Sequence, residues 1–123
     1  MASGTTLLLA EDDSTSLYMM AEILERAGYT VVTAVDGQDA VEKFAAHKDE
    51  IKLVISDVVM PRKSGKAASD EIREMDKTMK FIFVTGHTLG EFGPDDVSGT
   101  GNVIMMKPLL PFELMSKIRE LLV

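Results

Sequence analysis

Short apolar runs recur along the chain, separated by longer segments in which apolar residues return at helical spacing. Within each run the apolar residues are mostly continuous rather than alternating with polar ones, which is typical of strands buried on both faces of a sheet. Such strands need helices packed on each side, so the pattern predicts a parallel sheet covered by helices. The predicted strands are residues 5–10, 29–34, 52–56, 80–84 and 102–106.

The segments between the predicted strands carry helix signals. Gly28 suits the C′ position after the first helix, and Pro111 suits the first turn of the last one. The predicted helices are residues 14–27, a second one from residue 37, residues 65–75, and a last one from residue 111. The side chains expected to face the core are Met19, Met20, Ile23, Leu24 and Ala27 in the first helix, Ala40, Val41, Phe44 and Ala45 in the second, and Leu114, Met115, Ile118, Leu121 and Leu122 in the last.

Residues 86–101 break this alternation, because a fourth helix is due there and the segment is rich in glycine and holds Pro94. Each interior glycine costs a helix about 1 kcal/mol relative to alanine, and proline costs about 3 kcal/mol. A helix in this segment is therefore expected to be short, displaced to one side of Pro94, or mobile.

Composition narrows the possible classes of protein. The chain has 123 residues, of which 46% are hydrophobic and 27% charged, as expected for one globular domain over residues 1–123. We expect residues 1–4 to be flexible or a cloning remnant. The net charge of -7 argues against direct binding of nucleic acid, which needs clustered Lys and Arg. No apolar run is long enough to insert into a membrane, and the absence of cysteine fits the cytoplasm.

Charged or potentially reactive side chains follow four of the predicted strands. Glu11, Asp12 and Asp13 come after the first strand, and Asp57 comes after the third. The fourth and fifth strands are followed by a hydroxyl and an ammonium group, those of Thr85 and Lys107. Parallel strands bring their carboxyl ends to one edge of the sheet, where open α/β sheets bind ligands. These groups are therefore expected to meet.

The expected cluster of acids needs a cation. Two carboxylates about 4 Å apart repel by roughly 4 kcal/mol at an effective dielectric constant near 20. Lys107 offsets part of this repulsion, and a divalent metal ion can offset the rest. Mg²⁺ is commonly held by one or two carboxylates together with phosphate and water, so these residue types predict a magnesium site.

The motifs at these strand ends resemble those of the response-regulator receiver domain of two-component signalling, in particular its chemotaxis-regulator type. The resemblance extends from Leu7 to Leu122. It implies a doubly wound (βα)5 fold of the flavodoxin-like type, with a five-stranded parallel sheet in the order 2-1-3-4-5. The matching motifs are Glu11-Asp12, Asp57-x-x-Met60-Pro61-x-x-x-Gly65, Thr85-Gly86 and Lys107-Pro108.

The resemblance implies a role for each matching residue. Asp57 looks like the phosphoacceptor, which takes a phosphoryl group from phosphohistidine. Asp12 looks like a direct ligand of Mg²⁺, for which Mn²⁺ can substitute, and Glu11 like a ligand acting through water. The backbone carbonyl of Val59 would complete the metal site together with Asp57.

Two further residues would contact the phosphoryl group. By resemblance, Lys107 would donate from its ammonium group and Thr85 from its hydroxyl. Each also has a structural explanation, since Thr85 could satisfy a strand-end backbone group and Lys107-Pro108 could be a simple loop. Asp13 is expected to be an acid at a helix N-terminus, and His87 either tunes the phosphate lifetime or is an exposed loop residue.

The chain departs from the family three residues before Lys107. Receiver domains usually carry Tyr or Phe there, and the ring turns inward when the threonine moves; this chain has Ile104. An aliphatic side chain cannot make the same movement, so Thr85 and Ile104 are expected to form an atypical switch. We expect the switch to work by ordering residues 86–101.

The first helix suggests a docking surface. If its core face is the one given above, Leu17 and Tyr18 lie on the opposite side, close to the acids. Exposed apolar side chains beside a reaction centre can bind a partner, although single exposed apolar residues are also common. By resemblance the partner would be a sensor histidine kinase or a histidine phosphotransfer protein.

The expected function is thus Mg²⁺-dependent phosphoryl acceptance by a signalling switch that is not a turnover enzyme. The chain could stand alone or belong to a larger hybrid kinase or regulator. The alternative is a degenerate receiver that acts as an unphosphorylated scaffold. A flavodoxin-like phosphate-binding protein is disfavoured because acids in the first loop would repel phosphate. A haloacid-dehalogenase-type phosphatase is disfavoured because that class has a second aspartate where this chain has Val59.

Overall fold

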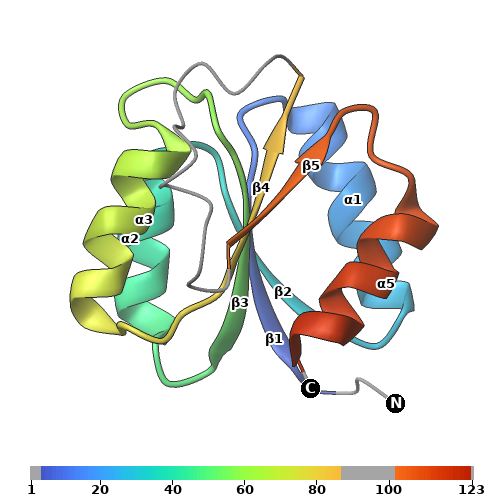
Figure 1. The fold of residues 1–123 in the computed structure, drawn as a ribbon, viewed down its shortest axis with the longest axis horizontal. Helices are drawn as coiled ribbons and strands as arrows, with labels where there is room; N and C mark the ends of the chain where they lie inside the picture. The colour runs from blue at the N-terminus through green and yellow to red at the C-terminus, as the bar shows by residue number, and fades with distance from the viewer. Residues whose placement is uncertain (1–3, 87–101, 123) are drawn as a thin grey trace.

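The chain folds as a parallel sheet with helices on both faces, as the sequence predicts (Figure 1). The computed structural model describes residues 4–86 and 102–122. Apart from Gly86, the segment 86–101, for which a fourth helix and an ordering switch are predicted, therefore lies outside the described residues, as do His87 and residues 1–3. The elements are β1 (Thr6–Ala10), α1 (Ser14–Arg26), β2 (Thr30–Ala34), α2 (Gly37–His47), β3 (Ile51–Asp57), α3 (Gly65–Met75), β4 (Phe81–Thr85), β5 (Asn102–Met106) and α5 (Pro111–Leu122).

The strand order β2-β1-β3-β4-β5 confirms the predicted topology. All neighbouring strands are parallel, so their carboxyl ends share one edge of the sheet. α1 and α5 cover one face of the sheet, whereas α2 and α3 cover the other (Figure 1). None of the helices that the structure describes is long and apolar enough to span a membrane.

The continuous apolar strands supply two cores because successive side chains point to opposite faces. Leu7 and Leu9 of β1 pack in the core beneath α1 and α5. Leu8 and Ala10 pack in the core beneath α2 and α3. The three central strands are buried along almost their whole length, which explains why they lack a polar-apolar alternation.

Most helix boundaries match the sequence signals. Gly28 follows α1 with φ of 105°, a conformation that glycine adopts at little cost. Pro111 begins α5 as predicted. The side chain of Asp13 caps α1 by accepting a hydrogen bond from the Ser16 backbone N–H at 3.0 Å, which agrees with the N-terminal role expected for this acid.

The predicted core faces of two helices need correction. In α1 the buried residues are Leu17, Ala21 and Leu24, whereas Met19 is 57% exposed. The predicted face is therefore rotated toward Met19, and Leu17 lies inward instead of outward. In α2, Ala45 is exposed, contrary to prediction.

Candidate functional site

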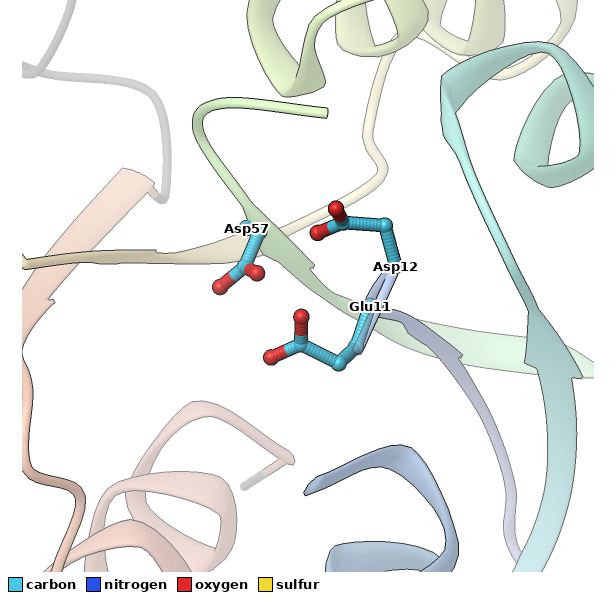
Figure 2. Close-up of side chains that lie close together, drawn as sticks. All are labelled: Glu11, Asp12 and Asp57. Atoms are coloured by element: carbon cyan, nitrogen blue, oxygen red, sulfur yellow. The ribbon is translucent and has the colours of Figure 1, made fainter. Parts of the chain in front are cut away.

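Three carboxylates meet at the carboxyl edge of the sheet. Asp57 is the last residue of β3, while Glu11 and Asp12 follow β1 directly. Each contributes one oxygen to a group whose members all lie within 4.8 Å of one another. In Figure 2 the three side chains converge from the two adjacent strands on a common space. The structure thus brings together the acids that the sequence singles out.

The ammonium group of Lys107 lies against this cluster. Its Nζ is 3.2 Å from the Asp57 carboxylate and 3.5 Å from Oε1 of Glu11. Its backbone N–H donates to the Thr85 carbonyl at 2.8 Å, which ties the end of β5 to the end of β4. One ammonium group therefore faces two of the three carboxylates.

The charges of the cluster are only partly balanced. Burial raises the pKa of Asp57 to about 7, and the adjacent Glu11 carboxylate adds to the increase against the opposing effect of Lys107. For Glu11, burial is outweighed by hydrogen bonds from Asp57 and the Asp13 backbone, so its pKa is lowered. For Lys107, burial is outweighed by attraction to Asp57, so its pKa is raised. The cluster can accommodate more positive charge.

The backbone around Asp57 is held on two sides. Val58 donates its N–H to the Val84 carbonyl at 3.0 Å and accepts from the Gly65 N–H at 2.8 Å. A Cβ at Gly65 would lie 2.1 Å from the Asp57 carbonyl oxygen. Gly65 therefore allows α3 to start directly against the end of β3, which explains the glycine eight residues after the aspartate.

The two predicted switch residues lie on neighbouring strands. Thr85 is the buried last residue of β4. Ile104 of β5 is paired with Phe83 of β4 and packs, half-buried, against the core beneath α2 and α3. The fully buried ring of Phe83 stacks on Phe81 with centroids 5.3 Å apart. An aromatic side chain thus lies beside the aliphatic switch position.

The structure exposes only one of the two residues predicted to form a docking surface. Tyr18 is 71% exposed, but Leu17 is only 9% exposed and packs in the core with Leu24. Leu17 is therefore wrong as a docking residue, because the core face of α1 includes it. Met19, which the sequence places in the core, is exposed on α1 instead of Leu17.

A groove of about 660 Å³ opens between α1 and the loop that joins β5 to α5. Met19, Met20 and Ile23 line it from α1, and Leu109 lines it from the loop. Its polar end is formed by Glu11, Asp57 and Lys107. Sequence reasoning missed this groove, although the methionines on successive positions of α1 are consistent with an adaptable apolar surface.

Sequence reasoning also missed an ion pair between Asp36 and Arg62. The guanidinium donates from Nε at 2.7 Å and from Nη2 at 3.1 Å to the two oxygens of the Asp36 carboxylate. Asp36 also caps α2 by accepting from the Asp39 N–H at 2.8 Å. The hydrogen bond from Arg62 is the main reason that the pKa of Asp36 is lowered. The two residues are 26 positions apart in the sequence, so no local sequence pattern predicts their contact.

The donor set fits a hard divalent cation. All three acids offer carboxylate oxygens, the ligand type that Mg²⁺ prefers. Asp12 is exposed, which leaves the cluster open to solvent on one side. Val59 lies two residues beyond Asp57 at the start of the next loop, and the residue is 64% exposed. A carbonyl ligand from Val59 stays a prediction.

The fold and this edge define a class of protein, namely open parallel α/β proteins that bind a ligand where strand ends present acids and a lysine. Comparison with known proteins gives the family within that class. The family model described as "Response regulator receiver domain" matches residues 7–119. The chain belongs to the response-regulator receiver domain family.

Individual relatives agree with this assignment. The response regulator receiver protein CpdR of Brucella abortus is 29% identical over 117 residues, which are 95% of this chain and 96% of CpdR. The sensor kinase CckA of the same organism is 30% identical over 122 residues, which are 99% of this chain but 13% of the kinase. Similar sequences thus occur both as nearly whole proteins and as small parts of larger ones.

Solved structures share the fold. A receiver domain protein from Clostridium thermocellum superimposes with a TM-score of 0.89 at 26% identity, covering 96% of this chain and 94% of that one. The response regulator TrrA from Thermotoga maritima, solved in complex with Mg²⁺ and BeF, gives a TM-score of 0.82 at 27% identity, covering 95% and 98% of the two chains. The resemblance to receiver domains that four short sequence motifs indicate is confirmed.

Proposed function

We propose that this receiver domain accepts a phosphoryl group from phosphohistidine on Asp57, in a Mg²⁺-dependent reaction, and that the modified state is read by a partner protein. The observation that carries the proposal is the group formed by Asp57, Glu11 and Asp12 with the Lys107 ammonium 3.2 Å from Asp57. TrrA, a relative with the same fold, was solved with Mg²⁺ and BeF.

The reaction is a transfer between two nucleophiles. An oxygen of the Asp57 carboxylate attacks phosphorus and forms an O–P bond, while the N–P bond to the donor histidine breaks. The electron pair of that bond stays on the imidazole, and Asp57 becomes an acyl phosphate. Little covalent chemistry is left for other residues in such transfers, so positioning and charge neutralisation dominate.

Glu11, Asp12, Asp57 and the Val59 carbonyl are the residues that would hold Mg²⁺, and Mn²⁺ would serve as well. The bound ion would supply positive charge to the nucleophile and the phosphoryl oxygens. The carboxylate oxygens of Glu11, Asp12 and Asp57 lie within 4.8 Å of one another, and Asp57 is buried. Their mutual repulsion favours binding of a cation.

Lys107 and Thr85 complete the proposed site. The Lys107 ammonium already lies beside the nucleophile and would turn to a phosphoryl oxygen as charge develops there. Thr85 ends the neighbouring strand and would donate its hydroxyl to another oxygen. With Ile104 in place of an aromatic residue, the change at Thr85 would reach the surface by a route other than a rotating ring.

The phosphodonor would be a sensor histidine kinase or a histidine phosphotransfer protein, and the chain would work in the cytoplasm. Such a partner needs a surface next to Asp57. The apolar groove between α1 and the β5–α5 loop ends at Asp57, and the exposed side chains of Tyr18 and Met19 lie on α1. We assign donor docking to this groove. The chain would act as a switch that is modified once per signal rather than as a turnover enzyme.

The experiment that tests this proposal is incubation with acetyl phosphate and Mg²⁺ followed by intact-mass measurement. Wild type should gain the mass of one phosphoryl group, and Asp57→Asn should gain none. Omission of Mg²⁺ should suppress the adduct in wild type. Unmodified wild type in the presence of donor and metal would instead favour the unphosphorylated scaffold.

A further inference from the structure

The loop between β3 and α3, residues 58–64, is fastened at its two ends by backbone hydrogen bonds to β4 and α3. Val58 bonds to the Val84 carbonyl and to the Gly65 N–H. Met60 adds an apolar anchor, since it is only 7% exposed and packs in the core beneath α2 and α3. These contacts hold the loop at Val58, Met60 and Gly65. Between Met60 and Gly65, the Lys63 N–H donates to the Pro61 carbonyl at 2.7 Å and the Lys63 ammonium pairs with Glu71 of α3.

The middle of the loop is tied to α2 by the ion pair of Arg62 with Asp36. Both donor–acceptor distances, 2.7 Å from Nε and 3.1 Å from Nη2, are those of a two-pronged hydrogen bond. The Asp36 side chain is 8% exposed, whereas that of Arg62 is 60% exposed. Asp36 itself is immobilised as the N-cap of α2. The arginine is therefore the movable partner and the aspartate the fixed one.

The backbone of this segment is adapted to the ion pair. Arg62 has φ of 65°, a left-handed conformation that is unfavourable for a side chain of this size. Beside it, Gly37 lets the Lys63 carbonyl approach so closely that an added Cβ would lie 2.0 Å from the oxygen. A strained residue and a close backbone approach persist only when surrounding contacts determine them. The Asp36–Arg62 pair is the side-chain contact from this loop to α2, beside the Lys63–Glu71 ion pair to α3.

We propose that the Asp36–Arg62 pair positions the β3–α3 loop for binding of the divalent ion, by holding the backbone at Val59 in place beside Asp57. Neither side chain of the pair touches the ion, so both are positioning residues. This inference rests on the metal site of the proposed function. It adds two residues outside the acidic cluster: Asp36, which lies outside the four motifs, and Arg62, which occupies an unspecified position between Pro61 and Gly65.

The test is the affinity of the folded protein for Mn²⁺, measured from the electron paramagnetic resonance signal of the free ion during a titration. Arg62→Asn removes the guanidinium and places at φ 65° a residue that tolerates this conformation. Asp36→Asn keeps an acceptor for the α2 cap, because Asn and Asp cap equally well. Each variant should bind Mn²⁺ about tenfold more weakly, as is typical when a residue that orients a ligand is lost.

Two comparisons separate positioning from general stability. The double variant should bind no more weakly than either single variant, because both remove the same contact. Arg62→Lys should recover part of the affinity by restoring one charged hydrogen bond. As the matched control, Arg26→Gln removes the exposed ion pair with Glu22 on α1 and should leave Mn²⁺ affinity unchanged.

The possible results have different meanings. Equal Mn²⁺ affinity in wild type, Arg62→Asn and Asp36→Asn would overturn the positioning role alone. Additive losses in the double variant would also overturn it, because they would show independent effects. Absence of Mn²⁺ and Mg²⁺ binding by wild type would overturn the metal site of the proposed function together with the positioning role.

Discussion

Replacing Asp57 by Asn should stabilise the metal-free protein at neutral and alkaline pH. The Asp57 side chain is 7% exposed, and burial beside Glu11 raises its pKa from 3.8 to about 7. Between these two pH values the folded chain keeps the Asp57 proton while the unfolded chain loses it. The contribution of Asp57 to the free energy of unfolding of wild type therefore falls as the pH rises from about 4 to about 7, and this contribution levels off above pH 7.

The magnitude follows from the size of the shift. A change of about 3 pKa units corresponds to about 4 kcal/mol of ionisation cost at pH 8. This cost already includes the attraction of the Asp57 carboxylate to Lys107. Asn removes the cost but leaves the Lys107 ammonium without this partner, so we expect a net gain of about 1–3 kcal/mol. The advantage of the variant should grow by about 2–3 kcal/mol between pH 5 and pH 8.

The assay is urea denaturation of wild type and Asp57→Asn in EDTA at pH 5 and pH 8. At pH 8 the urea midpoint of the variant should be higher by about 1 M. Added Mg²⁺ should then stabilise wild type more than the variant, because ligand binding to the folded state adds stability. An equal or lower midpoint for the variant at pH 8, or a difference that does not grow with pH, would refute the reasoning about Asp57.

Four further substitutions test other parts of the structure. Leu17→Asp should lower the free energy of unfolding by about 3 kcal/mol or more because Leu17 is buried. Tyr18→Asp should leave urea denaturation nearly unchanged, and it should slow phosphoryl transfer from a phosphohistidine protein but not from acetyl phosphate. A Tyr18→Asp variant less stable than Leu17→Asp would contradict the corrected core face of α1. Gly37→Ala should cost about 1–3 kcal/mol in the same assay through its clash with the Lys63 carbonyl, and a wild-type midpoint would exclude that close approach. Lys107→Met should slow adduct formation from acetyl phosphate about 10²-fold, and an unchanged rate would remove this residue from the reaction.

The sheet could be predicted from the sequence because its central strands are apolar without interruption. Leu7, Leu8 and Leu9 show the reason, since they are all buried but are shared between two cores. A continuous apolar run of this length is typical of a strand in a sheet that is covered on both faces. The strand order came from family resemblance, because pairing among parallel strands leaves no local signal.

The core face of α1 could not be predicted reliably. Its first two turns carry Leu17, Tyr18, Met19 and Met20 in succession, so several faces are apolar and periodicity alone does not choose among them. The structure selects Leu17 because it continues the spacing of Ala21 and Leu24. Burial against α5 and the sheet decided the orientation, and those partners are distant in sequence.

The acidic cluster could be predicted because each of its members lies at the end of a strand or directly after it, and strand ends meet by topology. The Asp36–Arg62 pair could not, since Asp36-Gly37 gives only a turn signal and Arg62 lies in a loop whose path depends on Met60 and Gly65. Local patterns thus located the groups that would take part in the chemistry. The contacts that hold these groups in place depend on the folded chain.

The most direct test of the central claim is to locate the phosphoryl group. After reaction with acetyl phosphate and Mg²⁺, borohydride reduces an acyl phosphate and marks the residue that carried it, which peptide mass spectrometry then identifies. The proposed function predicts one modified residue, Asp57, and loss of the modification when EDTA replaces Mg²⁺. Modification at another residue, or at Asp57 regardless of metal, would contradict the proposal that Glu11, Asp12 and Asp57 form a metal-dependent phosphoacceptor site.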